Sequence, residues 1–187
     1  MKKIFLLAAM ALFTLSASAQ VKIAHVNFSE LYQLTSDADA ARSTMAAAQK
    51  EANETFQSMY EEFQTKYNEY QQKSSTWTPA IKENKEKELS EINNRLQEFQ
   101  QSIQQELAQK EQQLYEPIIA KVRETVEKLA KSGGYAMVFD SSQYLYADDT
   151  ICKDLTADAK KALGIPADRT LESLQKELQA QAQAQQQ

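Results

Sequence analysis

The sequence predicts an α+β fold in which a small β-containing body carries one long antiparallel, coiled-coil-like helical hairpin. Only three glycines and three prolines occur in 187 residues, whereas all-β folds need many turn residues. The long middle region is rich in Gln, Glu, Lys and Ala, which are good helix formers. Strand-like segments precede and follow this helical region, so we expect both chain ends to build one body.

The first 19 residues have the pattern of a cleaved export signal. Lys2 and Lys3 precede an apolar run that is too short to span a bilayer. The small residues at Ala17 and Ala19 fit a signal peptidase site. We predict cleavage between Ala19 and Gln20 and a periplasmic mature chain. The alternative is an N-terminal anchor helix that is not cleaved.

The charge balance argues against several classes of partner. Without Lys2 and Lys3, 19 basic and 26 acidic residues remain, a net charge of −7. An acidic chain of this kind is not expected to bind nucleic acid or an anionic membrane surface. No later apolar run approaches the length of a membrane span.

Few residues are suited to catalysis. Cys152 is the only cysteine and His25 the only histidine, so an internal disulfide is excluded and a metal cage is not expected. The sequence also contains no Gly-rich phosphate loop. We therefore predict no enzymatic activity, no cofactor and no metal.

The body is assigned to residues 20–36 and 132–166. Its predicted strands are rich in β-branched and aromatic residues and lie at 21–28, 135–140 and 144–147. Ser29 is expected to cap a short helical turn, and Thr156 a helix over 157–163. Residues 167–187 form a C-terminal extension, in which leucines 171, 174 and 178 mark a helical stretch and a frayed Gln/Ala-rich tail follows.

Residues 37–131 form the arm, with its tip near 73–79. Thr78 suits an N-cap and Pro79 a first helical position, while Pro117 is expected to kink the second helix. From Met45 onward the apolar stripe of the first helix follows an 11-residue repeat, which favours a nearly straight helix pair. The stripe consists of Ala41, Met45, Ala48, Ala52, Phe56, Met59, Phe63, Tyr67 and Tyr70.

Three short strands make a poor core for one subunit, and their edges need partners. We therefore expect oligomers that associate through the strands and project their hairpins. The candidate residues for this association are the apolar members of the first two strands: Ile23, Val26, Phe28, Met137, Val138 and Phe139.

The order and spacing of several segments resemble the Skp/OmpH family of periplasmic chaperones, over about residues 1–165. The segments that carry the resemblance are Lys22-Ile23-Ala24-His25-Val26-Asn27-Phe28, Leu114-Tyr115-Glu116-Pro117-Ile118, Gly134-Tyr135, Val138-Phe139-Asp140, Leu145-Tyr146-Ala147-Asp148 and Asp154-Leu155-Thr156. The resemblance implies a homotrimer whose three subunits share a small oligomeric β-barrel body. It also implies helical arms around a cavity that holds unfolded outer-membrane proteins without ATP. Members of this family are often basic, so this acidic chain inherits no lipid site.

Six aromatic residues on the arm are candidate client contacts: Tyr60, Trp77, Phe56, Phe63, Tyr67 and Tyr70. The alternative is that they pack one arm helix on the other, which we favour for the stripe positions. Tyr60 lies off the stripe and Trp77 lies at the tip, so for these two both interpretations stay open. A competing function is that of a structural or adaptor coiled-coil protein of the cell envelope.

Overall fold

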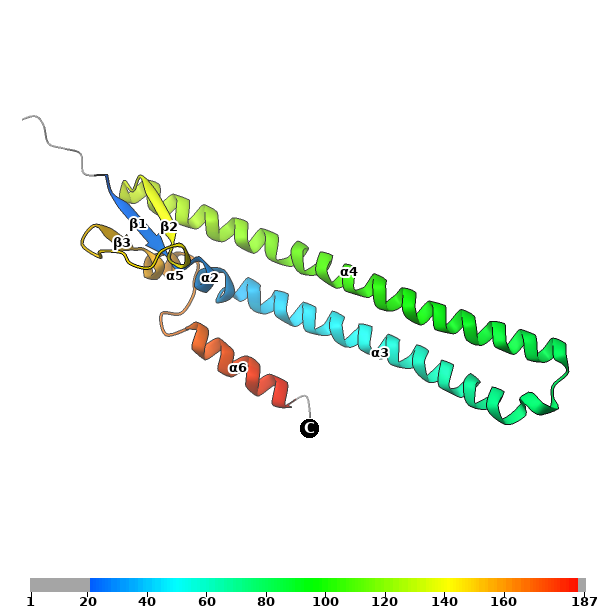
Figure 1. The fold of residues 1–187 in the computed structure, drawn as a ribbon. Helices are drawn as coiled ribbons and strands as arrows, with labels where there is room; N and C mark the ends of the chain where they lie inside the picture. Colours follow the sequence, from blue (N-terminus) through cyan, green and yellow to red (C-terminus); the bar gives the residue numbers. More distant parts are fainter. Residues whose placement is uncertain (1–20, 185–187) are drawn as a thin grey trace, which may run out of the picture.

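The computed structural model describes residues 21–184, so the predicted signal and cleavage site lie outside the described residues. Figure 1 shows a small body at one end and a long two-helix arm extending from it. The elements are β1 (Ile23–Val26), α2 (Phe28–Gln33), α3 (Ser36–Lys73), α4 (Pro79–Gly133), β2 (Met137–Asp140), β3 (Cys152–Asp154), α5 (Thr156–Ala162) and α6 (Leu171–Ala184). The predicted body with a helical-hairpin arm is confirmed.

The three strands form one parallel sheet in the order β2-β1-β3. Ile23 of β1 lies opposite Met137 of β2 and Cys152 of β3. Both outer strands are edges, so the sheet of a single chain is open. A closed barrel is not formed by one subunit.

The predicted third strand at 144–147 is wrong. This segment has the side chains of a strand, but the free edge of β1 pairs with β3 instead. Asp148 sets up that pairing: its carboxylate accepts hydrogen bonds from Thr150, and its carbonyl oxygen accepts one from the Cys152 N–H at 2.8 Å. Within the described chain, residues 144–147 are therefore left as an irregular loop.

The first strand is also shorter than predicted, because a helix begins within it. The Asn27 side chain accepts a hydrogen bond from the Glu30 N–H at 3.0 Å and so caps α2 in place of Ser29. Phe28 therefore belongs to a helix. Thr156 does not act as the cap of α5 either, since its hydroxyl accepts a bond from the Asn27 N–H.

One face of the sheet packs on helices and forms the body's core. Ala24 and Val26 lie on this face with Leu31 of α2, and Val122 of α4 is fully buried beside them. The remaining core residues are Leu155, Ala159 and the partly buried Phe28, Tyr32, Val126, Leu129, Tyr135, Val138 and Leu163. The root of the arm is thus part of the body's core.

The arm helices begin and end close to the predicted residues. Thr35 caps α3 by accepting a hydrogen bond from the Ala38 N–H at 3.1 Å. A short turn at Ser74–Thr76 forms the tip, and Pro79 stands at the start of α4 as predicted. The helix α4 runs on without a break through Pro117.

The described part of the predicted Gln/Ala-rich tail is helical, since α6 continues to Ala184. Thr170 and Ser173 exchange hydrogen bonds between their hydroxyls and backbone N–H groups, which starts the helix in a capping-box arrangement. Leu174 then packs in a small cluster with Leu34 and Ile165.

Gly134 ends α4 in the left-handed conformation, with φ of 68°. The next residue, Tyr135, donates its N–H to the Ala130 carbonyl at 2.9 Å, which satisfies an open helix end. This turn directs the chain into β2 next to β1.

We expect Gly134→Ala to lower the free energy of unfolding by about 1–2 kcal/mol, because a side chain disfavours this conformation. Nothing lies within 4 Å of an added Cβ, so a steric clash adds no cost. Gly134→Asn is the matched control and should lose less, since Asn tolerates left-handed φ. Urea unfolding followed by circular dichroism at fixed concentration measures both, and equal losses would contradict this account.

Candidate functional site

The two arm helices are joined by a thin apolar seam. On α3 only Ala38, Ala41 and Ala52 are buried, and on α4 only Ile92, Leu96, Ile118 and Val122. A cavity of about 260 Å³ lies between the helices near Ala52, where Phe99 and Ile103 face small residues. Small side chains at the middle of the seam therefore leave the helix pair loosely packed.

Four aromatic residues of α3 form two stacked pairs, which we call the arm aromatic row: Phe56, Tyr60, Phe63 and Tyr67. The ring centroids are 6.4 Å apart in Phe56–Tyr60 and 5.9 Å apart in Phe63–Tyr67. In each pair the phenylalanine is partly buried, whereas Tyr60 and Tyr67 are 42% and 44% exposed. Because the tyrosines are seven residues apart, they lie on one side of α3.

The predicted place of Tyr67 in the packing stripe is wrong. The partly buried position belongs to Lys66, whose ammonium pairs with Glu88 of α4. Tyr67 points outward, and the aliphatic stem of Lys66 takes the inner place.

At the tip, Trp77 is partly buried against Tyr70, with the rings edge to face and their centroids 5.9 Å apart. The Tyr70 hydroxyl donates a hydrogen bond to the Glu86 carboxylate across the hairpin. This hydrogen bond raises the pKa of Tyr70, because the carboxylate disfavours the tyrosinate. The tip pair thus ties the two helices together.

The charged outer faces of the arm carry pairs of opposite sign one turn apart. Lys82 lies 3.9 Å from Glu86, and Lys87 lies 3.8 Å from Glu91. These are the solvated helical pairs that the mixed charge run predicts. Such exposed pairs contribute little to stability.

A second apolar surface covers the outer face of the sheet. Here Phe139 and Tyr144 line a groove of about 460 Å³, together with Ile23, Tyr146 and Ile151. We call these five residues the body apolar face. Met137 points to the same side of the sheet as Phe139 and is 57% exposed.

The predicted association residues divide between the two faces of the sheet. Val26 is buried in the subunit's own core, and Phe28 and Val138 pack against that core. Ile23, Met137 and Phe139 lie on the outer side, where another chain can reach them.

Sequence reasoning missed the exposed loop residues Leu145, Tyr146 and Ile151. Leu145 and Tyr146 are 107% and 81% exposed. Leu145 and Tyr146 belong to the segment that the sequence predicts as a strand. The competing pairing of β3 with β1 leaves no local mark in the sequence.

The lone cysteine and the lone histidine both lie in the sheet, and the His25 Nδ1 is 3.8 Å from the Asp154 carboxylate. Cys152 is buried, and burial raises the pKa of its thiol, which keeps it protonated and poorly nucleophilic. His25 is buried in the central strand beside Tyr144. Within residues 21–184, no three acidic, His or Cys side chains are placed to hold a metal. None of the helices described here is long and apolar enough to cross a bilayer.

Comparisons with known proteins agree with this architecture. Residues 22–163 match the family described as outer membrane protein (OmpH-like). The chain is 28% identical over 164 residues to the chaperone protein Skp of Yersinia enterocolitica, covering 86% of this chain and 98% of that protein. A crystal structure from Caulobacter crescentus CB15, provisionally described there as an OmpH-like outer membrane chaperone, matches with a TM-score of 0.69. That match has 14% identity and covers 79% of this chain and 86% of the other, so it supports the fold.

The tip pair predicts a pH-dependent fluorescence change. Trp77 is the only tryptophan, and ionisation of the adjacent Tyr70 should quench it by energy transfer. Because Glu86 raises the pKa of Tyr70, Glu86→Gln should move the quenching midpoint to lower pH. Tyr70→Phe is the control and should lose this quenching step. An unchanged midpoint in Glu86→Gln would show that the tip bond is absent in solution.

Proposed function

This chain belongs to the OmpH-like family of outer membrane proteins, and from that premise we propose that it is a periplasmic chaperone. In this proposal it holds unfolded outer-membrane proteins between helical arms, prevents their aggregation and uses no ATP. The similarity to a curated Skp chaperone over 86% of the chain supports the chaperone role. The predicted export signal supports the compartment.

The observation that carries the mechanism is the exposure of Tyr60 and Tyr67 on a solvated arm. Each ring stacks on a phenylalanine of the seam, so its position is held although its outer surface is free. Aromatic side chains offer a large apolar contact area with few torsions to order. An array of such rings suits weak contact with many different apolar segments.

The loose seam favours this function over that of a rigid spacer. A spacer of the envelope needs a continuous packed interface, whereas the middle of this arm contains a cavity near Ala52. Loosely packed helices can bend or shift to follow clients of different size. The arm geometry therefore supports a holdase better than a structural adaptor.

We further propose that three chains associate through the body apolar face and the adjacent Met137. Phe139, Tyr146 and Ile151 expose apolar surface on one side of an open sheet. Exposed patches of this kind mark protein interfaces, and two free strand edges add unpaired backbone groups. Cyclic association at the body would place the arms side by side around a common space.

Several weak contacts acting together explain how a client can be bound and released without ATP hydrolysis. Each arm offers only a few exposed rings, so single contacts form and break quickly. Three arms raise the effective concentration of contacts for a captured client and so raise the overall affinity. The client is then released when it folds or when it binds another partner.

The first test removes the exposed rings. We expect Tyr60→Ala with Tyr67→Ala to weaken suppression of aggregation about tenfold or more, because each ring contributes about 1 kcal/mol of apolar contact. Light scattering of an outer-membrane β-barrel protein diluted from urea measures this. The matched control is Gln57→Ala with Gln64→Ala, which has the same spacing on α3 at exposed polar positions. Equal suppression by both double variants would remove the arm aromatic row from the mechanism.

The second test concerns assembly. Size-exclusion chromatography with light scattering should give the mass of three mature chains. We expect Met137→Lys with Phe139→Lys to give single chains, because two buried, unpaired ammonium groups oppose association. Gln71→Lys with Gln72→Lys adds the same charge near the arm tip and should leave three chains together. A wild-type monomer would end the trimer proposal.

A further inference from the structure

The C-terminal helix α6 is packed over only its first turn. Leu174 is 5% exposed, whereas every residue from 175 to 184 is exposed, including Leu178 at 41%. Ten helical residues without packing are marginally stable in water. The family match ends at residue 163, so this helix lies outside the matched segment.

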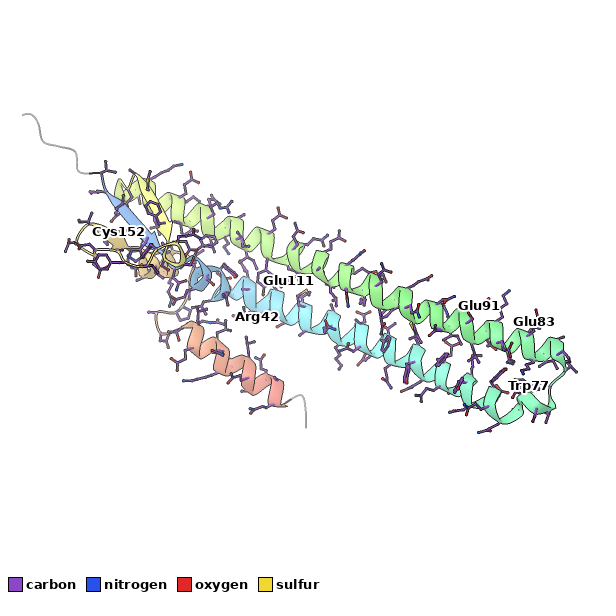
Figure 2. The ribbon with its side chains drawn as sticks, viewed as in Figure 1. Arg42, Trp77, Glu83, Glu91, Glu111 and Cys152 are labelled. Carbon is purple, nitrogen blue, oxygen red and sulfur yellow. The ribbon has the colours of Figure 1, made fainter. Side chains whose placement is uncertain are left out.

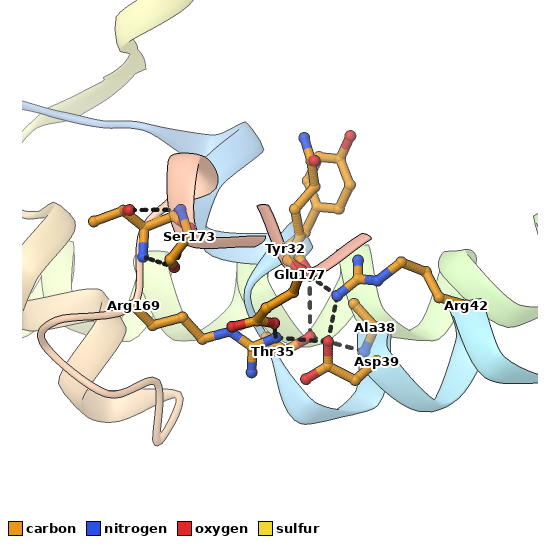
Figure 3. A network of polar contacts seen from close by, with 10 residues as sticks. Tyr32, Thr35, Ala38, Asp39, Arg42, Arg169, Ser173 and Glu177 are labelled. Atoms are coloured by element: carbon orange, nitrogen blue, oxygen red, sulfur yellow. Dashed lines mark hydrogen bonds and ion pairs between the residues drawn. The ribbon is translucent and has the colours of Figure 1, made fainter. Parts of the chain in front are cut away.

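The start of α6 is nevertheless firmly anchored to the body and to the root of the arm (Figure 3). Arg169 donates a hydrogen bond to Asp39 of α3 at 2.7 Å, and Arg42 pairs with the same carboxylate oxygen. Lys160 donates to the Arg169 carbonyl at 2.5 Å and pairs with Glu30 at 3.0 Å. The Glu177 carboxylate in the second turn lies 3.9 Å from the Arg169 guanidinium, so the anchor extends to this residue. The part of α6 beyond Glu177 is exposed and can swing about the anchored start.

Burial opposes the charge on Asp39, but hydrogen bonds from Arg169 and Arg42 hold the pKa of this carboxyl below its usual value. The anchor is therefore ionised at neutral pH. Leu174 adds an apolar contact with Leu34 and Ile165 on the same side.

A groove of about 500 Å³ separates the free half of α6 from the root of the arm. On the α6 side its wall consists of Leu174 and Leu178. The opposite wall contains the apolar or aromatic residues Tyr32, Ala108, Tyr115 and Ile119 and the polar residues Gln33, Arg42, Glu111 and Gln112. Figure 2 shows Arg42 and Glu111, two polar residues of this groove, where α3 and α4 leave the body. The α6 wall is therefore apolar, whereas the arm-root wall combines apolar and polar residues.

We propose that α6 is a lid that turns about its anchored start and closes the arm-root groove. Closure would bring Leu178 onto Tyr115 and Ile119 and remove apolar surface of both walls from water. In the closed position the lid would also block the binding of apolar client segments at the arm root. This last consequence rests on the proposed chaperone function, whereas closure itself does not.

A disulfide placed across the groove tests closure in the full mature chain. In a Cys152→Ala background, Leu178→Cys with Ala108→Cys should form an intrachain disulfide under oxidised glutathione. The matched control is Leu178→Cys with Gln109→Cys, which moves the partner thiol one residue round α4, off the groove wall. We expect the groove pair to close at least about tenfold faster, because closure raises the effective concentration of the two thiols.

Mass spectrometry of the unreduced chain separates the outcomes. Equal rates in the two pairs would overturn the lid, and a disulfide between two chains would instead assign the free half of α6 to a neighbouring copy. If the lid closes, the oxidised groove pair should suppress client aggregation less than the same protein after reduction. Equal suppression would overturn the gating role. A wild-type chain without any suppression would refute the chaperone proposal, while the disulfide rates would still report on closure.

Discussion

The parallel pairing of β1 with β2 is the constraint on which the rest of the molecule depends. Parallel strands cannot be joined by a tight turn, so the chain must leave at the end of β1 and return to the opposite end of the sheet to begin β2. Here Ile23 pairs with Met137, and the whole arm is the crossover between them. The arm root is therefore part of the body's core, through Val122, and the two helices stay together at their base without strong packing along their length.

Because the body core holds the base of the arm, the arm can expose aromatic rings. Stability comes mainly from the body, where Ala24, Leu31 and Val122 are fully buried. The seam needs only to keep α3 and α4 side by side, which small residues and the Lys66–Glu88 pair accomplish. Tyr60 and Tyr67 then stack on Phe56 and Phe63 and are not needed to pack α3 on α4. A tightly packed hairpin would have drawn these rings inward.

The helices were predictable because their signals are local: apolar spacing, Pro79 at a helix start and Gly134 at a helix end each act within a few residues. The third strand was not, because the choice between residues 144–147 and Cys152–Asp154 depends on which segment reaches the free edge of β1. The outward position of Tyr67 could not be predicted, because periodicity does not decide which of the neighbours Lys66 and Tyr67 takes the inner place. The packing of α6 depends on Arg169 meeting Asp39, 130 residues apart in sequence, which periodicity cannot reveal.

The exposed rings attract other chains, whereas the acidic surface repels other acidic chains. Reversible binding requires that neither effect dominates. Apolar contacts draw chains together without regard to sequence, so rings alone would promote clumping of loaded complexes. A net charge of −7 for the predicted mature chain opposes such association between complexes through mutual repulsion. The repulsion falls off with distance and salt, whereas ring contacts act only at the surface. In the proposed function, short-range attraction combined with long-range repulsion would let this chain hold a client while loaded assemblies stay apart.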